Sequence, residues 1–205
     1  MSLTITLPQP GTYAINRNDG GLTKDEFWEL CSKNPELVIE RDANGQITVM
    51  SPVGFKTGER ENIINAYLTI WAIENGSGTT ASPSTGFILP SGEVRSADAS
   101  WISDGRLEGA EAEDLDRFPE LVPDFIVEIR SKSDNLKPLQ EKMRNTWMAA
   151  GVRLSWLFDI QGEQVFIYRE NGEVEVVNGL GATLSGEDVL PGFSFDVARI
   201  NKKYP

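Results

Sequence analysis

Histidine is absent from the 205-residue sequence. Without an imidazole the chain cannot build a Ser-His-Asp or Cys-His hydrolase site, a histidine-rich zinc site or a histidine-based pH switch. Any acid–base or metal chemistry must therefore come from carboxylates, lysine, tyrosine or backbone groups.

Cysteine and long apolar runs are scarce as well. Cys31 is the single cysteine, which excludes internal disulfides and thiolate metal clusters and fits a reducing compartment. No apolar run reaches the length of about 18 residues that a membrane-spanning helix needs. Residues 1–11 lack the basic start and the long apolar stretch of a signal peptide. We therefore expect a cytoplasmic protein that does not bind membranes.

Positive charge is in deficit. Lysine and arginine number 19 against 31 aspartate and glutamate residues, which gives a formal net charge of −12. Nonspecific affinity for nucleic acid depends on Lys and Arg, so this balance argues against it. The deficit is uneven, because residues 103–120 hold seven acidic residues and two arginines and so supply −5 of the total. We expect this segment to be an acidic surface loop with one helical turn around 111–115.

The remaining composition is typical of a globular protein, with 40% apolar, 9% aromatic and 24% charged residues. The length fits one domain of ordinary size, and no repeat or linker divides the chain. We predict a single domain over residues 1–205, in which residues 1–20 form an N-terminal extension.

The N-terminal half predicts two helices, a hairpin and short strands. Thr23 and Glu26 have the spacing of a capping box, which marks the start of a helix. Asn44-Gly45 suits the tight turn of a hairpin. The expected elements are a helix from Thr23 that ends before Pro35, hairpin strands at 37–41 and 46–50, an amphipathic helix at 57–74, and strands near 79–81, 86–89 and 97–102.

The C-terminal half predicts a buried strand, a helix and three strands joined by hairpins. Gly151 has the position of a glycine that ends a helix. The expected elements are a strand at 123–130, a helix at 135–150 and a C-terminal β-meander with strands at 152–159, 164–169 and 173–177. Helices interleaved with hairpin-connected strands predict an α/β (α+β) fold, in which a mixed β-sheet is flanked by helices.

Three residues are candidates for chemistry: Asp98 on a short strand, Glu128 inside an apolar strand and Lys142 on the helix that follows. A carboxylate inside an apolar strand is costly to bury without a partner. The partner of Glu128 is either a divalent metal shared with Asp98 or, in a structural ion pair, the ammonium of Lys142 or the guanidinium of Arg130.

The metal alternative would make a catalytic site. Asp98 and Glu128 on adjacent strands would offer oxygen ligands to Mg²⁺ or Mn²⁺, which needs one or two carboxylates together with water and substrate phosphate. The metal would lower the pKa of a bound water, while Lys142 would orient that water or stabilise the developing negative charge. An acidic pair with a downstream lysine occurs in many proteins, so these residues alone do not decide between the alternatives.

Six segments in a fixed order carry a resemblance to a known family. They are Ser51-Pro52-Val53-Gly54, Arg95-Ser96-Ala97-Asp98-Ala99-Ser100, Pro123-Asp124-Phe125-Ile126-Val127-Glu128-Ile129-Arg130-Ser131, Leu139-Gln140-Glu141-Lys142-Met143, Gly151-Val152-Arg153-Leu154-Ser155-Trp156-Leu157 and Leu190-Pro191-Gly192-Phe193. Together they resemble the bacterial putative restriction endonuclease family, which is especially abundant in cyanobacteria and belongs to the PD-(D/E)XK nuclease superfamily. The resemblance extends over about residues 20–200.

The resemblance implies an endonuclease that hydrolyses DNA with a divalent metal, in a restriction-endonuclease-like core. Asp98 matches the first metal-binding aspartate and Glu128 the second acidic ligand. Lys142 resembles the family's lysine, displaced from the strand onto the following helix. A further acidic ligand often comes from the first long helix in this superfamily, where Glu61 is preferred over Glu59.

Two departures from the pattern bear on activity. In the superfamily's simplest pattern a lysine stands two residues after the second acid, and here that position is Arg130, which cannot readily act as a base. Ala97 stands where the family usually has proline. Either Lys142 reaches the site from its helix, or the site is impaired.

The densest basic stretch, 129–153, flanks the expected site. It is either a solvated helix face or a surface for the DNA backbone, with Arg130, Lys132 and Arg144 as substrate-binding residues. Trp147, by contrast, has apolar neighbours and is expected in the core rather than stacked on bases.

Three functions therefore stay open. The first is a DNA endonuclease, acting as a homodimer because two strands require two sites. The second is a catalytically idle protein of the same fold that binds a protein or assembles into oligomers, as the −12 charge and Arg130 suggest. The third is hydrolysis of a small nucleotide, which needs no long basic groove.

Overall fold

The computed structural model describes residues 13–15 and 22–202, so most of the expected N-terminal extension lies outside the described residues. Contacts between residues divide the chain into two compact units. Unit 1 comprises residues 1–52, 86–96 and 110–121, and unit 2 comprises residues 53–85, 97–109 and 122–205. A single domain over the whole chain stays a prediction.

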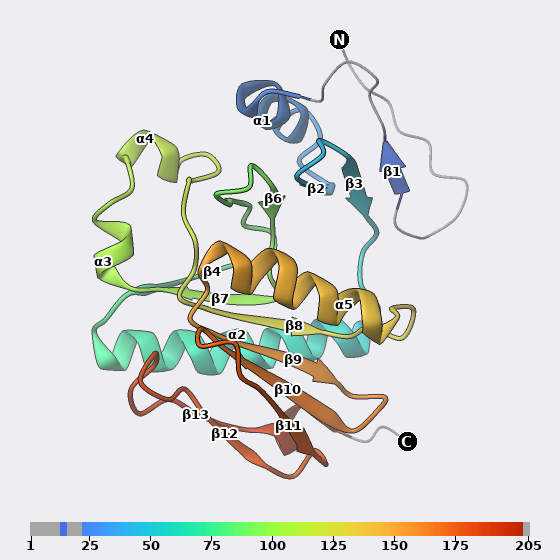
Figure 1. Cartoon of the computed structure of the whole chain (residues 1–205), viewed down its shortest axis with the longest axis vertical. Helices are drawn as coiled ribbons and strands as arrows, with labels where there is room; N and C mark the ends of the chain where they lie inside the picture. Colours follow the sequence, from blue (N-terminus) through green and yellow to red (C-terminus); the bar gives the residue numbers. More distant parts are fainter. Residues whose placement is uncertain (1–12, 16–21, 203–205) are drawn as a thin grey trace. The chain divides into compact units, whose positions relative to one another are not determined.

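Unit 1 contains a five-stranded antiparallel sheet with the strand order β1-β3-β2-β6-β5 (Figure 1). The Thr23 hydroxyl accepts a hydrogen bond from the Glu26 N–H, and the Glu26 carboxylate accepts one from the Thr23 N–H, so the predicted capping box is confirmed. The predicted hairpin is confirmed as β2 and β3. The elements of unit 1 are β1 (Tyr13–Ile15), α1 (Lys24–Ser32), β2 (Val38–Arg41), β3 (Ile47–Met50), β5 (Phe87–Ile88), β6 (Val94–Arg95) and α4 (Ala112–Leu115).

Unit 2 contains a six-stranded mixed sheet with the strand order β11-β10-β9-β8-β7-β4. Strands β8 and β9 are parallel, and the other neighbours pair antiparallel. The elements are α2 (Phe55–Asn75), β4 (Thr79–Ala81), β7 (Ala99–Ile102), α3 (Asp104–Leu107), β8 (Phe125–Ile129), α5 (Leu136–Lys142), η1 (Met143–Met148), β9 (Leu154–Asp159), β10 (Gln164–Arg169), β11 (Val174–Asn178), β12 (Thr183–Ser185), β13 (Ser194–Asp196) and η2 (Val197–Ile200).

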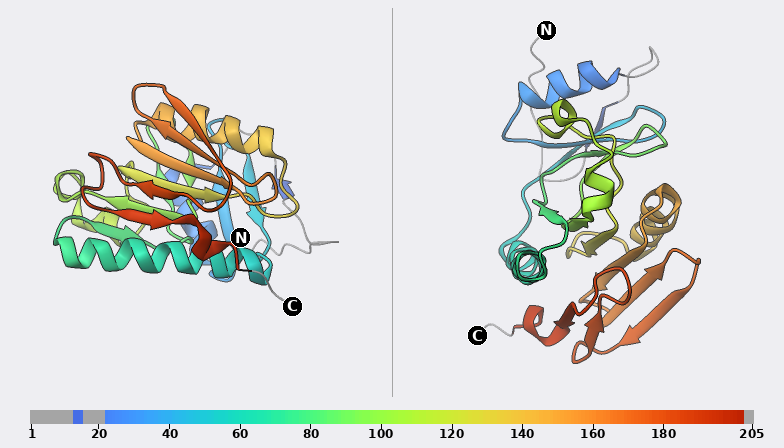
Figure 2. Two further views of the ribbon diagram at one scale, coloured as in Figure 1. Left: turned by 90° about the horizontal axis from the view of Figure 1, so that it is seen from below. Right: turned by 90° about the vertical axis from the view of Figure 1, so that its left-hand side faces the viewer.

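Helices cover both faces of the six-stranded sheet. Figure 2 shows α2 on one face and α5 on the other, with the strands between them. The side chains of Ile64 and Leu68 on α2 are fully buried and pack with the aromatic residues of β8 and β9 in the main core. Trp156 stacks on Phe193 there, with ring centroids 5.9 Å apart. This arrangement confirms the predicted mixed sheet flanked by helices and the predicted β-meander of β9, β10 and β11.

The helix expected over 135–150 is not α-helical throughout. It is an α-helix only to Lys142, and a π-helix, η1, follows from Met143 to Met148. The π-helix is rare and its apolar spacing differs little from that of an α-helix over one turn, so the sequence pattern did not indicate it. Gly151, with a φ of 104°, closes the helix as predicted.

Several short elements were also missed or misassigned. The strands expected near 79–102 belong to two different sheets, because strand order depends on long-range pairing that local patterns do not encode. The acidic segment 103–120 contains the expected turn, α4, and an additional one, α3. The two-residue strand β6 and the hairpin β12–β13 are too short to show a period. In the described part of the chain, no helix is both long and apolar enough to cross a bilayer.

Candidate active site

Strands β7 and β8 bring Asp98 and Glu128 together. The antiparallel register pairs Ala99 with Val127, so Asp98, which directly precedes β7 rather than lying within it, stands opposite Glu128. The Oδ2 atom of Asp98 accepts a hydrogen bond from the backbone N–H of Ile129 at 2.6 Å. The Asp98 carboxylate is therefore fixed against the end of β8. The predicted adjacency of the two chain segments is confirmed, but Asp98 lies just before its strand and not within it.

Glu128 is buried, with 6% of its surface exposed. Its Oε1 atom accepts a hydrogen bond from the indole Nε1 of Trp147 at 2.8 Å, and the ammonium of Lys142 lies 2.8 Å from the same atom. Both partners come from the helix that packs on this face of the sheet. Lys142 therefore reaches the site from its helix, which was one of the two alternatives left open by the sequence.

The π-helix explains how both side chains reach one carboxylate oxygen. Lys142 and Trp147 are five residues apart, and an α-helix turns by about 100° per residue, so five residues would place them on different sides of the helix. Hydrogen bonding from i to i+5 instead brings residues five apart onto one side. The Lys142 ammonium accordingly lies 5.9 Å from the centre of the Trp147 ring, at the limit of a cation–π contact.

Helix α2 supplies a third carboxylate, that of Glu61. Asn65, one turn later, donates from its amide to the backbone oxygen of Glu61 at 2.9 Å and to that of Asp98 at 2.6 Å. This amide ties the helix to the segment that enters β7. The charge of Glu61 acts to raise the pKa of Asp98, and the charge of Glu128 acts to raise the pKa of Glu61.

The electrostatics of these groups show an excess of negative charge. Burial raises the pKa of Asp98 well above its usual range, and the charges of Glu128 and Glu61 raise it further, against the opposing effects of the Ile129 N–H and Lys142. Burial and the charge of Glu128 also raise the pKa of Glu61. The Lys142 ammonium pairs with Glu128 and acts on the charge of Asp98, while Glu61 has only the repulsion of Glu128, and repulsion among the carboxylates favours the uptake of a proton or a cation.

The donors fit a hard divalent cation such as Mg²⁺. They are carboxylate oxygens, and such a cation is commonly held by one or two carboxylates with waters and substrate phosphate. Within the described residues, no group of three or more acidic or cysteine side chains is arranged to enclose a metal ion. Asp98 and Glu128 are therefore the two carboxylates to consider as ligands, with Glu61 beside them.

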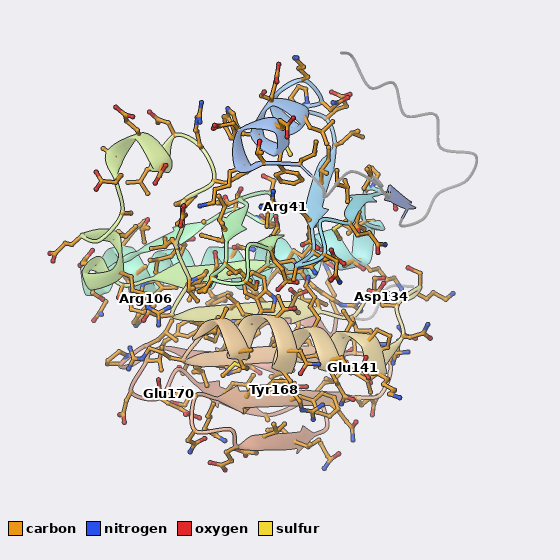
Figure 3. All side chains as sticks on the ribbon, turned by 45° about the horizontal axis from the view of Figure 1, so that its top comes forward. Arg41, Arg106, Asp134, Glu141, Tyr168 and Glu170 are labelled. Atoms are coloured by element: carbon orange, nitrogen blue, oxygen red, sulfur yellow. The ribbon has the colours of Figure 1, made fainter. Side chains whose placement is uncertain are left out.

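The three expected substrate-binding residues lie in different surroundings. Arg130 pairs with buried Asp159 at 2.9 Å and donates from Nε to the backbone oxygen of Asp134 at 3.0 Å. Asp134 lies in the loop between β8 and α5 (Figure 3). Lys132, in the same loop, is exposed. Arg144 is directed elsewhere: its guanidinium lies over the ring of Tyr168 on β10, two strands away from β8 in the sheet order.

Two residues of the site were missed by sequence reasoning. Trp147 was expected in the core, and it is fully buried, but its indole N–H is committed to Glu128. Asn65 carried no signal beyond its place on the polar side of a helix. A tryptophan five residues after a lysine is a clue only once the helix is known to be of the π type.

Comparison with known proteins identifies a matching family and a solved structure of similar fold. The model of the Uma2 family, described as "putative restriction endonuclease", matches residues 24–198. Among solved structures, a putative nuclease belonging to DUF820 from Anabaena variabilis has a TM-score of 0.70 at 17% sequence identity, covering 87% of this chain and 97% of that chain. A search of curated proteins gave no match.

At 17% identity the structural match shows the fold alone. The sequence match is decisive for the family, because it extends over well over half of the chain and across both units. It confirms the resemblance carried by the six ordered segments. The chain belongs to the Uma2 putative restriction endonuclease family.

Proposed function

We propose that the chain is a divalent-metal-dependent endonuclease that hydrolyses phosphodiester bonds in DNA, with Asp98, Glu128 and Lys142 as its catalytic residues. The observation that carries this proposal is the placement of Asp98 opposite Glu128 at the end of β8, with the ammonium of Lys142 2.8 Å from Glu128. Membership of a family described as restriction endonucleases supports the reaction class. The sheet strands β7 and β8 with α2 and α5 would form its restriction-endonuclease-like core.

Asp98 and Glu128 would hold the cation, Mg²⁺ or Mn²⁺. Because the described residues contain no group of three acidic side chains arranged around a metal, Glu61 would serve as a further ligand only after a shift of its side chain. When bound, the cation supplies charge neutralisation at the scissile phosphate and a more acidic water. The three acids lie on separate elements, the segment before β7, the strand β8 and the helix α2, and the backbone amide of Ile129 already fixes one of them.

Two side chains of the helix position the carboxylate of Glu128. Trp147 and Lys142 hold Oε1 of Glu128, which turns the carboxylate so that its second oxygen is the one left for other partners. With substrate bound at Glu128, the ammonium of Lys142 would place positive charge beside the attacked phosphate, and fixed charge of this kind lowers the barrier. Arg130 takes no part as a base, because its guanidinium stays protonated and pairs with Asp159.

A catalytically idle protein that binds other proteins or assembles into oligomers is the second candidate. The observation that favours it is the ion pair between Lys142 and Glu128, which can serve the fold without any metal. Isothermal titration calorimetry separates the two candidates. Binding of Mn²⁺ or Mg²⁺ at millimolar concentration or below, lost in Asp98→Asn, supports the endonuclease, and no heat of binding supports the idle protein.

Cleavage itself is the direct test. Purified protein is incubated with supercoiled plasmid and with single-stranded DNA in the presence of Mg²⁺ or Mn²⁺, beside Asp98→Ala, Glu128→Gln and Lys142→Met. The matched control is Glu141→Gln, an exposed glutamate on the same helix as Lys142, labelled in Figure 3. Cleavage by the wild type and the control but not by the other three supports the proposal. Equal cleavage by all five proteins would sink it.

DNA as the partner, a homodimer as the acting species and a cytoplasmic location belong to the same proposal. A homodimer would provide one site for each strand of a duplex. Size-exclusion chromatography with light scattering on the full chain tests this point, and a monomer that cuts both strands would contradict it.

A further inference from the structure

A pocket of about 500 Å³ opens at the N-terminal end of α2 within unit 2. Its walls include four basic side chains and two apolar ones, from α2, from the segment after β8 and from the turn after β9. They are Lys56, Arg60, Arg130, Lys132, Phe55 and Ile160. Figures 1 and 2 show α2 beginning at the end of the sheet where β8 ends, which is why these segments meet.

The charge of this pocket is opposite to that of the chain. Four of only 19 basic residues line it, and its described lining contains no acidic side chain, although the chain has 31 acidic residues. Cations gathered in one concave site raise the local concentration of anions. The pocket therefore suits an anionic ligand, although the net charge of the whole chain is −12.

Two of the cations are held in place and still have donors to offer. The Nε atom of Arg60 donates to the backbone oxygen of Ile200 at 3.0 Å, and within the described residues its two terminal nitrogens make no hydrogen bond. Arg130 is anchored through Nε and Nη1, to Asp134 and Asp159, and its Nη2 makes no hydrogen bond within that part of the chain. Anchored guanidinium groups with remaining N–H donors suit the planar oxygens of a phosphate.

The apolar part of the pocket suits a nucleobase. Phe55 exposes 77% of its surface at the start of α2, which is unusual for a phenylalanine that serves only a core. Aromatic side chains beside a basic groove stack on the bases of single-stranded nucleic acid, and every base offers a face for such stacking.

The pocket adjoins the candidate active site. Arg60 precedes Glu61 on α2, and Arg130 follows Glu128 by two residues, a separation of about 6.6 Å in extended backbone. We propose that the pocket binds one nucleotide of a single DNA strand next to the bond that the carboxylates address, with its phosphate on Arg60, Arg130 and Lys132 and its base against Phe55. The proposal rests on the proposed function, which supplies the neighbouring site.

The test measures binding without cleavage. A fluorescein-labelled twelve-nucleotide thymidine strand is titrated with the full chain in EDTA, and fluorescence anisotropy gives Kd over a range of salt concentrations. Lys132→Gln and Arg60→Gln should each raise Kd about tenfold and reduce the slope of log K against log salt by about 0.7. Phe55→Ala should raise Kd about tenfold with the slope unchanged, because stacking releases no counterions.

The matched control is Lys137→Gln, an exposed lysine on α5 outside the pocket, which should leave Kd and the slope as in the wild type. A duplex of the same sequence should bind at least about tenfold more weakly, because its bases are not available for stacking. The inference is overturned if the wild type does not bind the strand, if the pocket variants bind as the wild type does, if Lys137→Gln loses as much, or if the duplex binds equally well.

Failure of this inference is distinguishable from failure of the proposed function. A chain that cleaves DNA but whose pocket variants bind normally would lose only the nucleotide subsite. A chain that does not cleave but binds the strand through these residues would keep the subsite and lose the endonuclease.

Discussion

Each unit contains a buried group of acidic side chains. The two groups differ in how far ion pairs and hydrogen bonds compensate their negative charge. In unit 1, Arg95 bridges Glu40 and Glu93, with contacts of 3.0 Å and 2.7 Å. The remaining carboxylate oxygens accept hydrogen bonds from the Ser96 N–H and the Ser91 hydroxyl. Although burial opposes it, the two carboxylates raise the pKa of Arg95.

In unit 2 the ammonium of Lys142 pairs with Glu128, and burial together with repulsion from neighbouring carboxylates raises the pKa of Asp98 and of Glu61. In unit 1 each carboxylate oxygen of Glu40 and Glu93 has a donor from the protein, although Arg95 Nε is buried without a hydrogen-bond partner in the described residues. In unit 2 the neighbouring carboxylates keep an excess of negative charge, which a proton or the proposed cation would reduce. The two groups therefore differ in their pairing and not in burial alone, and under the proposed function this difference marks the site.

The largest expected difference is in catalysis. Asp98→Asn should lower the rate of DNA cleavage by at least about 10³-fold, because it removes a charged group from the proposed site. Glu40→Gln, the matched change in unit 1, should leave the rate within about twofold. A plasmid-nicking assay on the two purified variants measures both. If Glu40→Gln were as inactive as Asp98→Asn, the distinction between the two groups would be wrong.

The next effect is on stability. Arg95→Met should lower the free energy of unfolding by about 3–5 kcal/mol, because it leaves Glu40 and Glu93 buried without their cation. Urea denaturation at neutral pH measures the loss, and Arg95→Lys serves as a control that keeps the charge. A loss below about 1 kcal/mol for Arg95→Met would show that the unit 1 group does not depend on its arginine.

The acidic groups of the two units should also differ in how their contributions to stability depend on pH. Because the pKa of Asp98 is raised, its contribution to stability is present below the ordinary aspartate pKa and is lost as the pH rises through the raised value. Without divalent ions the Tm should fall across that range, and less so in Asp98→Asn. Mn²⁺ at ten times its Kd should restore about 1.4 kcal/mol near pH 8 and less near pH 5.5, since protons compete for the carboxylates.

Differential scanning fluorimetry at the two pH values, with and without Mn²⁺, checks this prediction. Glu40→Gln is the control and should keep the full response to Mn²⁺. A response of equal size at both pH values, or one that persists in Asp98→Asn, would contradict the assignment of Asp98 as a ligand.

The smallest effect is expected at Trp147. Trp147→Phe removes one hydrogen bond to a charged carboxylate and should lower the free energy of unfolding by about 1–2 kcal/mol and the affinity for Mn²⁺ by up to about tenfold. Trp71→Phe is the control, because the indole of Trp71 donates only a 3.3 Å bond to the Pro191 oxygen. Calorimetric titration of both variants distinguishes them, and equal Mn²⁺ affinities would exclude a positioning role for Trp147.

Much of the fold was predictable because its signals are local. Thr23 and Glu26 start α1, and Asn44-Gly45 fits the loop between β2 and β3. Strand-like apolar segments separated by Gln161-Gly162 and Asn171-Gly172 mark the β-meander. The sequence also predicted that Asp98 and Glu128 belong to adjacent strands, but their opposition follows from the register of β7 and β8, which local patterns do not give.

The features that the sequence did not predict depend on how side chains are rotated about a helix and on pairing between segments distant in sequence. The division of the strands between two sheets, and the hairpin β12–β13, follow from contacts distant in sequence. Arg144 was assigned to the substrate surface because the basic stretch was taken as one face, whereas its position in the π-helix turns it over Tyr168. The basic pocket was missed in part because Lys56 and Arg60 lie some 70 residues before Arg130 in the printed sequence.

The π-helix η1 also bears on how the protein can change. A single π turn is equivalent to one additional residue inserted into an α-helix, and each residue of an α-helix turns the chain by about 100°. The one additional residue between Met143 and Met148 therefore sets how Lys142 is rotated about the helix axis relative to the part of the helix that packs on the sheet. This helix is therefore more sensitive to insertions and deletions than to substitutions. The loss of one residue from η1 would rotate Lys142 away from Glu128, although the sequence would still contain every acidic residue of the site.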